Sequence, residues 1–546
     1  MIPGRISVRT ASLFLLLALI PLAAWSESAA TAAGEAIYRE GVLPSGEPLR
    51  GRRGSEASLE GAAAAACFNC HRRSGLGASE GRIVIPPITG KYLYRPDRSK
   101  PEDLDFRYVQ GYRLNREPYP DDASVARAIR EGIGKDGREL NYLMPRFDLD
   151  DASMASLLAY LRGLSKEVAP GVTADTLHFA TIITPDADPV KRQAMLAVLE
   201  RFFADKNDFI RGGAKPIQSS REIVYRVTRR WQLHVWDLAG APETWGAQLK
   251  KRLAEEPVFA VISGLGGRTW EPVHRFCQDE AVPCLFPNVD LPVVEETDFY
   301  PMYFSKGVWL EVELIAARLD EQKRQAGLRR VVQVFREDDI GEAAATALNR
   351  WAEDAGLQTV RRVVRGPGGS PLAAAVGDLH AGDALVLWLH KADVALLPAK
   401  APDNAVVYLS GLMGGLESTP LPAAWRPVTH MAHPVDLPEQ RRFRMNFPLG
   451  WLKVKQLPVT AERVQADTYL VCGILSEALG DMLDSFLRDY LEERLEDMLS
   501  RRVITGYYPR LGLGRGQRFA SKGGYMVRFA DPTGTRLLAE GDWTIP

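Results

Sequence analysis

This chain of 546 residues has only five cysteines, almost no excess of acidic over basic residues, and few long apolar stretches. The 68 Lys and Arg residues nearly balance the 69 Asp and Glu residues, which leaves a net charge of −1. Such a chain has no overall attraction for nucleic acid or for an anionic lipid surface, and we expect no nucleic-acid partner. The length exceeds what one hydrophobic core organises, so two or three domains are expected.

The one long apolar run spans residues 11–24, close to the N-terminus. Arg5 and Arg9 precede it and small residues follow it, which is the layout of a secretory signal peptide over residues 1–26. The alternative is an anchor that stays uncut, but the run is short for a membrane span. We therefore expect export to the periplasm, cleavage of the signal, and no transmembrane span in the mature protein.

Two of the five cysteines stand in the sequence CFNCH at residues 67–71, the attachment motif of c-type haem. Thiols about one helical turn apart can add to the two vinyl groups of one porphyrin, and the adjacent His71 can then coordinate the iron. The alternatives are a redox dithiol and half of a zinc site. The next histidine is only at His178, and EASLEGAAAAA before Cys67 indicates a helix, not the strand of a thioredoxin-like motif. The motif predicts one covalent haem c, attached to Cys67 and Cys70.

A second axial ligand is expected for an electron-carrying haem, and methionine raises its potential relative to histidine. Met144 lies in a predicted loop, directly before Pro145. Met154 is the rival, but its spacing to Leu157 and Leu158 is that of an apolar helical stripe, which indicates core. The predicted iron ligands are therefore His71 and Met144.

With these motifs, residues from about 34 to 164 resemble a class I cytochrome c. The resemblance implies an all-α domain, here residues 30–166, whose first helix packs Gly34 and Tyr38 against Leu157 and Tyr160 in the last. The segment PPITG is similar to the family's P-x-L-x-G segment. It implies that the carbonyl of Pro86 accepts a hydrogen bond from the second ring nitrogen of His71.

The chain departs from that family between Tyr38 and Cys67, where 28 residues stand in place of a few. This insert is rich in Gly, Pro and charge, and we expect a surface loop that could also cover a haem edge or contact a partner. Arg72 and Arg73, next to His71, either face the haem propionates or are solvated surface.

After a linker at residues 167–176, residues 177–546 alternate short apolar strands with helices of 10–15 residues. This pattern predicts a parallel α/β sheet covered on both faces, and its length predicts two lobes. Phrases such as VFAVISGLGG, FCQDEAVPCLFPNVD and YPMYFSKGVWLE resemble type I periplasmic binding proteins, the family of the branched-chain amino acid receptors. RRVVQVFREDDIGEAAATAL resembles the start of their second lobe, and GGYMVRFADPTGTRLLAEGDW their closing hairpin.

Such folds bind ligands between the lobes, at the carboxyl ends of strands. The turns after Ser263, Pro287, Ser305 and Glu337 are expected near that cleft. Amino-acid receptors of this family carry hydroxyl residues in the first of these turns, whereas GLGGRTW offers only Thr269. Arg268 in the same turn either pairs with an anionic ligand or is ordinary surface. The apolar surroundings of three tryptophans indicate core, not ligand stacking: Trp270, Trp309 and Trp388.

Cys277 and Cys284 could form a disulfide in an oxidising compartment, or remain two buried thiols. Cys472 lies in an apolar helical pattern and should be free. Among the remaining histidines only His430 and His433 have a spacing that could suit a metal. They lie in a predicted loop without an evident third ligand, which favours a structural role.

The sequence therefore predicts an exported monohaem electron carrier, not an enzyme, fused to a solute-binding-like module that docks a partner or senses a small ligand. Its redox partners would be a periplasmic dehydrogenase and an oxidase or another cytochrome, through small transient interfaces. The alternative is a solute-binding receptor of an ABC-type importer with an accessory or sensory haem.

Overall fold

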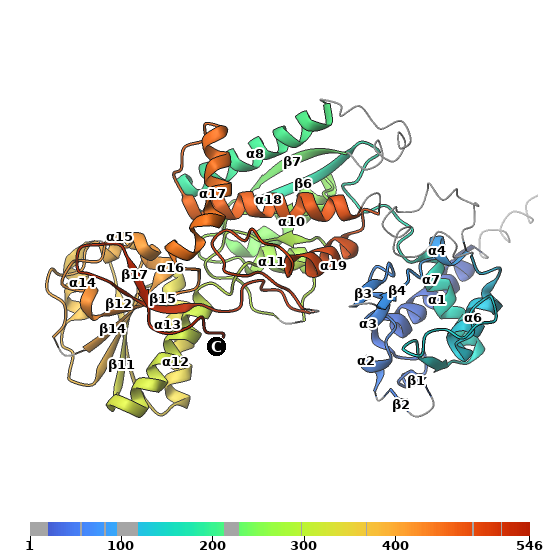
Figure 1. Ribbon diagram of the computed structural model, residues 1–546, viewed down its shortest axis with the longest axis horizontal. Coiled ribbons are helices and arrows are strands. Elements are labelled where there is room, and N and C mark those ends of the chain that lie inside the picture. Colours follow the sequence, from blue (N-terminus) through green and yellow to red (C-terminus); the bar gives the residue numbers. More distant parts are fainter. Residues whose placement is uncertain are drawn as a thin grey trace, which may run out of the picture. The chain divides into compact units, whose positions relative to one another are not determined.

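The chain forms two compact units, residues 1–168 and 169–546, in the computed structural model (Figure 1). The structure describes residues 20–54, 57–59, 61–80, 83–94, 118–211, 229–295, 297–366, 368–403, 405–482, 485–514 and 516–546. Most of the predicted signal peptide, residues 1–19, lies outside the described residues. None of the described helices is long and apolar enough to cross a bilayer.

Six helices and five short strands are described in the N-terminal unit. The helices are α1 (Ile20–Glu40), α2 (Ala62–Ala65), α3 (Phe68–His71), α4 (Gly90–Tyr94), α6 (Asp122–Glu131) and α7 (Asp151–Gly163). Helix α7 begins where Asp150 accepts a hydrogen bond of 2.7 Å from the Ser153 backbone N–H, an N-cap that satisfies a donor the helix cannot pair itself.

Helices α1 and α7 cross closely because Gly34 has no side chain. A Cβ there would stand 2.1 Å from the backbone oxygen of Ser156 and 2.7 Å from Cβ of Tyr160. Tyr38 reaches the same contact, with its ring 5.3 Å from that of Tyr160. This is the packing that the resemblance implied for the first and last helices.

The expectation of an all-α domain is not met, because strands occur in the unit. In the insert, β1 (Arg50–Arg53) pairs antiparallel with β2 (Ala57–Ser58) and with β5 (Arg146–Asp148). A second antiparallel pair joins β3 (Ala78–Glu80) and β4 (Ile83–Ile85). The insert is thus partly a sheet, and no loop of 28 residues: Leu49 is buried and β1 is held by a strand almost 100 residues away in the sequence.

The first lobe of the C-terminal unit is a five-stranded parallel sheet in the order β10-β9-β8-β6-β7. Its strands are β6 (Thr176–Ile183), β7 (Arg230–Asp237), β8 (Ala260–Ile262), β9 (Cys284–Leu285) and β10 (Pro301–Met302). The helices are α8 (Pro189–Arg211), α10 (Trp245–Glu255) and α11 (Glu271–Asp279). A 3-10 turn at Pro242–Thr244 directly precedes α10.

The second lobe is a seven-stranded sheet, β12-β11-β13-β14-β15-β16-β17, which is parallel up to β15 and then antiparallel. Its strands are β11 (Arg330–Arg336), β12 (Gln358–Val364), β13 (Asp383–Trp388), β14 (Ala405–Ser410), β15 (Thr429–His433), β16 (Tyr525–Phe529) and β17 (Leu537–Ala539). Its helices are α12 (Val308–Ala326), α13 (Ile340–Asp354), α14 (Gly369–Val376), α15 (Lys391–Val394) and α16 (Gly411–Gly414), with 3-10 turns at Leu416–Ser418 and Arg426–Val428.

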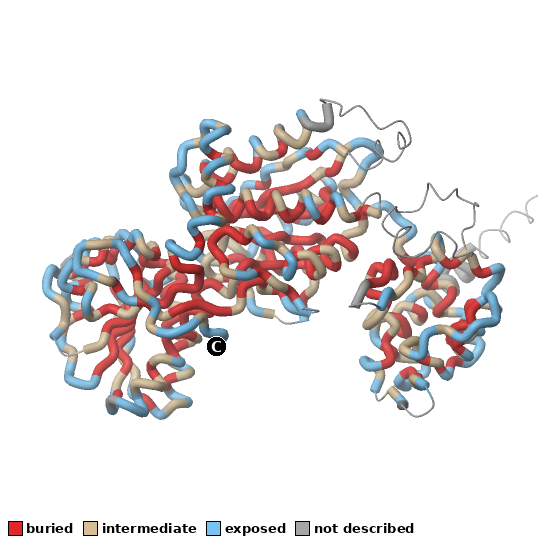
Figure 2. Tube along the Cα trace, viewed as in Figure 1, coloured by how far each residue is buried: buried red, intermediate tan, exposed pale blue. Residues whose placement is uncertain are grey.

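Both lobes have the buried centre of a sheet covered on two faces (Figure 2). Every residue of β13 is buried, and after Asp383 its residues are all apolar, as expected for a strand inside a parallel sheet. Three further helices complete the unit: α17 (Pro438–Val454), α18 (Glu462–Met482) and α19 (Arg488–Leu499). Helix α18 lies alongside α8 of the first lobe. The predicted two-lobed α/β architecture is confirmed.

Candidate functional site

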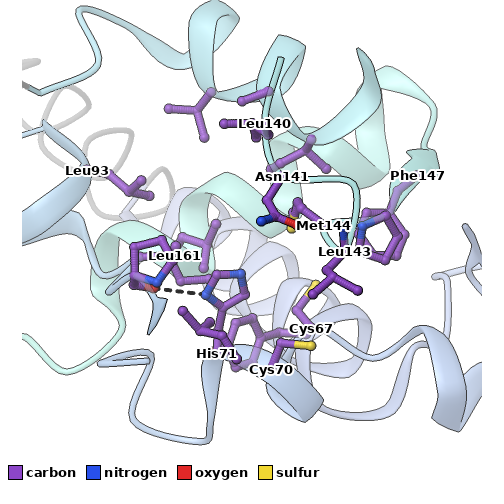
Figure 3. A pocket seen from close by; sticks show the side chains of 18 of the residues that line it. Cys67, Cys70, His71, Leu93, Leu140, Asn141, Leu143, Met144, Phe147 and Leu161 are labelled. Atoms are coloured by element: carbon purple, nitrogen blue, oxygen red, sulfur yellow. Dashed lines mark hydrogen bonds between the residues drawn. The ribbon is translucent and has the colours of Figure 1, made fainter. Parts of the chain in front are cut away.

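The N-terminal unit encloses a largely apolar hollow of about 310 Å³. Residues of the CFNCH motif form one part of its wall and the loop before β5 forms another (Figure 3). The lining consists of Tyr38, Arg53, Cys67, Cys70, His71, Ile83, Val84, Ile85, Pro86, Ile88, Leu93, Tyr119, Val125, Ala128, Ile129, Leu140, Asn141, Leu143, Met144, Pro145, Phe147, Leu157 and Leu161.

Helix α3 places the two thiols and the imidazole of the motif on this wall. The backbone N–H of His71 donates to the carbonyl of Cys67 at 3.0 Å, so one helical turn separates Cys67 from His71. Both cysteines are free thiols. Burial raises the pKa of Cys67 to about 12, with Cys70 as a lesser cause. A redox dithiol needs a lowered thiol pKa, so the environment of Cys67 disfavours that alternative.

The imidazole of His71 is oriented by Pro86. Its Nδ1 lies 3.0 Å from the carbonyl oxygen of Pro86, and the ring is buried. Because a carbonyl only accepts, Nδ1 carries the proton, and Nε2 is the nitrogen whose lone pair can coordinate a metal. The contact with Pro86 is the one that the resemblance implied.

Met144 contributes to the wall from the loop between α6 and β5. Its backbone N–H donates to the carbonyl of Asn141 at 2.9 Å, and its own carbonyl accepts from Nη1 of Arg146 at 2.7 Å. These bonds hold the loop while the thioether lines the hollow. Met154, the rival in sequence, is buried in α7 among the core residues and does not line the hollow.

The residues on the wall fit haem c. Two thiols stand one turn apart, His71 carries its proton on Nδ1 and its lone pair on Nε2, and a thioether lines the same apolar hollow. Arg72 and Arg73 do not line it. Among the described lining residues, Arg53 carries a permanent charge, and in the sequence it was only part of an insert.

A second hollow, of about 840 Å³, opens between the two lobes of the C-terminal unit. The turns after β6, β8 and β11 contribute to it, as expected for a crevice at strand carboxyl ends. Its polar side chains are Asp186, Arg268, Thr269, Asp338, Asp339, Glu342, Thr346 and Arg350. Trp309 also lines it from α12, so its predicted place in the core was wrong, whereas Trp270 and Trp388 are fully buried.

Arg268 bridges the two lobes across this crevice. Its Nε lies 3.5 Å from Oδ2 of Asp186 in the first lobe, and its Nη1 donates to the carbonyl of Asp338 in the second at 3.3 Å. The pKa of Asp186 is lowered. Burial acts to raise it, but hydrogen bonds from the Thr184 side chain and the Arg268 backbone outweigh this effect. Arg268 thus has a carboxylate partner within the chain itself.

The turns after Pro287 and Ser305 line a different and much smaller hollow, of about 20 Å³. Helix α18 fills the space there with Arg463 and Asp467. The Arg463 guanidinium donates to Asp290, and the Tyr508 hydroxyl donates to Asp467 at 3.3 Å. This cluster could not be predicted from the sequence, because its members lie far apart in the chain.

The remaining sequence candidates are structural. Cys277 and Cys284 are free and buried, not disulfide-bonded, and burial raises the pKa of Cys277 well above its ordinary value, with a hydrogen bond to Cys284 as a further cause. Cys472 is free and buried in α18, as predicted from its apolar pattern.

His430 and His433 lie on strand β15 and not in a loop. Residues three apart on a strand face opposite sides. His430 contacts Glu540 at 2.6 Å, while Nδ1 of His433 lies 2.8 Å from the carbonyl of Val435. The described part of the chain holds no group of three or more His, Cys, Asp or Glu side chains that could bind a metal ion.

Comparison with known proteins gives similarity to solved structures of binding proteins. A fatty acid ABC transporter substrate-binding protein from Thermomonospora curvata is 15% identical, with a TM-score of 0.49 over 70% of this chain and 95% of that one. A substrate-binding periplasmic protein from Ralstonia solanacearum is 14% identical, with a TM-score of 0.48 over 67% and 100%. A branched chain amino acid ABC transporter from Thermus thermophilus with bound valine is 12% identical, with a TM-score of 0.45 over 69% and 97%.

No protein-family model matches the chain. No curated protein matches it either. About a third of the chain is outside each of the three structural matches, and none of their names concerns a haem protein.

Proposed function

We propose that residues 30–166 bind one haem c covalently and that the protein is an exported electron carrier joined to a solute-binding-like module. The observation that carries the proposal is the shared hollow of Cys67, Cys70, His71 and Met144. When bound, the haem iron supplies one-electron chemistry between its ferrous and ferric states.

Each residue has a defined task in this proposal. Cys67 and Cys70 would anchor the macrocycle through thioether bonds and so hold it in the hollow. The Pro86 carbonyl holds the Nδ1 proton of His71, which fixes the ring and makes Nε2 a better donor. The Met144 thioether would supply a second ligand to the iron, and apolar neighbours such as Leu93 and Leu161 would keep water from the hollow.

The partners proposed for the carrier are a periplasmic dehydrogenase as electron donor and an oxidase or another cytochrome as acceptor. The test is respiration of cells that carry His71→Ala. Respiration with one electron donor should fall while uptake of solutes is unchanged. The wild-type protein should first be shown to carry haem in the same cells. Normal respiration of the His71→Ala cells with every electron donor would then contradict the role in electron transfer.

A second candidate function is a solute-binding receptor of an ABC-type importer that carries an accessory haem. The inter-lobe hollow of about 840 Å³ favours it, because it falls in the range of small-ligand sites and presents polar groups from both lobes. Two of the similar structures are named as ABC transporter proteins, one as a substrate-binding protein for fatty acids and one as a branched chain amino acid transporter with bound valine.

Ligand-induced thermal stabilisation distinguishes the two candidates. A receptor should be stabilised by one solute to the same extent in the oxidised and reduced protein, and Asp339→Asn should weaken the effect. Oδ2 of Asp339 is buried and has no hydrogen-bond partner in the described part of the chain, so it can serve a ligand. A carrier whose module senses or docks a redox partner should show stabilisation that depends on the redox state.

A further inference from the structure

Arg53 stands out on the wall of the N-terminal hollow because its charge is permanent. The other described lining residues, apart from His71, are uncharged at neutral pH: aliphatic and aromatic side chains, prolines, Asn141, the two thiols and Met144. A guanidinium against an apolar hollow is costly unless an anion meets it.

The pairing of β1 explains why Arg53 faces inward. Gly51 pairs with Phe147 of β5, and a Cβ at Gly51 would stand 3.0 Å from the Phe147 ring. Because side chains alternate along a strand, Arg53 lies on the face of Gly51, toward Phe147 and the hollow. Arg52 points the other way, is exposed, and lies 3.9 Å from Asp148 at the surface.

The Nε atom of Arg53 is buried and has no hydrogen-bond partner within the described residues. Leaving a buried donor unpaired is destabilising, and more so when the donor is charged. Buried donors in proteins almost always have a hydrogen-bond partner. Because the described residues supply none to Nε of Arg53, a bound group is the expected acceptor. Carboxylate is the acceptor whose two oxygens best match the guanidinium fork.

We propose that Arg53 is a positioning residue that pairs with a propionate carboxylate of the bound haem. The inference rests on the proposed haem binding and adds to it a role for the insert. In this proposal β1, which is paired with β2, places a cation next to the haem. The pairing of β1 with β5 connects it to the loop that contains Met144.

The pairing has a direct electrostatic consequence. The ferric iron carries one positive charge more than the ferrous iron, so a nearby cation disfavours the ferric state and raises the midpoint potential. Removing the Arg53 charge should therefore lower the potential, whereas removing the outward Arg52 charge should change it little because solvent screens it.

The test is a redox titration of the full-length holoprotein, with the mass of each variant confirming covalent haem. Arg53→Gln should lower the midpoint potential, Arg53→Lys should restore most of the wild-type value, and Arg52→Gln should match wild type. Arg53→Met, which keeps the length of the side chain, makes the same test if Arg53→Gln does not accumulate.

The outcomes separate the inference from the function beneath it. Wild-type protein without covalent haem overturns the proposed function. Haem-loaded Arg53→Gln or Arg53→Met with an unchanged potential overturns only the pairing of Arg53. An Arg53→Lys potential as low as that of Arg53→Gln would also overturn it, because the charge would then not be the cause.

Discussion

Nδ1 of His71 lies 3.0 Å from the carbonyl oxygen of Pro86, across 15 residues of sequence. The acceptor is a backbone carbonyl and has no side-chain rotamers, so its position is set once the backbone around β4 is folded. The bond selects one tautomer of the imidazole and one ring orientation before any metal is bound. The wall of the hollow therefore holds the His71 ring in one orientation without a bound group.

Met144→Ala should leave haem covalently attached but remove the sulfur ligand. The methionine-to-iron band of the oxidised protein should disappear and the midpoint potential should fall, because methionine ligation raises it. The matched control is Met154→Leu, a volume-conserving change in the buried core, which should leave both unchanged and cost less than about 1.5 kcal/mol. A Met144→Ala protein with an intact band would transfer the ligand role to another residue.

Gly34→Ala should destabilise the N-terminal unit. Its Cβ would meet the Ser156 backbone at 2.1 Å, and overpacking of this kind costs about 1–3 kcal/mol, here near the upper end because backbone cannot move aside. The measurement is the urea transition followed by haem absorbance. Gly163→Ala, at the end of α7 where nothing lies within 4 Å, should be neutral or slightly stabilising. Equal effects at both positions would contradict the close crossing of α1 and α7.

Glu311 should make the stability of the C-terminal unit depend on pH. Burial raises the pKa of Glu311 to about 8, while hydrogen bonds from Ser410 and the Leu412 backbone oppose the rise. The folded state then holds a proton that the unfolded state releases above its ordinary value of 4.5. This stabilisation is complete below 4.5 and is lost as the pH rises through about 8, by up to about 1.4 kcal/mol per pH unit.

Glu311→Gln should abolish this part of the pH dependence, and Glu313→Gln on the same helix, whose partner is the half-exposed Lys306, should retain it. The free energy of unfolding between pH 5 and 8 can be followed by fluorescence, since ten of the 11 tryptophans lie in the C-terminal unit. Parallel pH profiles for wild type and Glu311→Gln would show that Glu311 is ionised throughout.

Arg463→Met should destabilise the C-terminal unit by about 3 kcal/mol at neutral pH. It strips Asp290 of its guanidinium partner in a largely buried place, and an uncompensated buried charge is costly. Arg192→Met removes the partner of Asp237 at the exposed surface and should cost less than about 1 kcal/mol. Similar losses for the two variants, measured by urea unfolding, would mean that the Asp290 site is wetter than its burial indicates.

Local patterns were enough to predict the parts of the fold whose signals lie within a few residues. The run HFATIIT is the greater part of β6, and RRVVQVFRED contains β11, because a buried parallel strand is a mostly apolar run. The antiparallel pair of β16 and β17 lies where the resemblance implied a closing hairpin. The CFNCH motif and the loop position of Met144 needed only spacing.

Long-range pairing explains what the sequence could not show. The strands of the insert exist because β1 finds β5 far along the chain, and that pairing turns Arg53 toward the hollow. His430 and His433 look like a spaced pair only until β15 places them on opposite faces of a sheet. Trp309 lies in an apolar helical pattern, yet the second lobe leaves it at the crevice wall.

The mass and visible spectrum of the mature protein test the central claim most directly, when it is exported from cells with a working haem-attachment system. We predict a red protein whose mass includes one haem, retained under denaturing conditions and absent from Cys67→Ser/Cys70→Ser. A colourless wild-type protein with the mass of the polypeptide alone would contradict it.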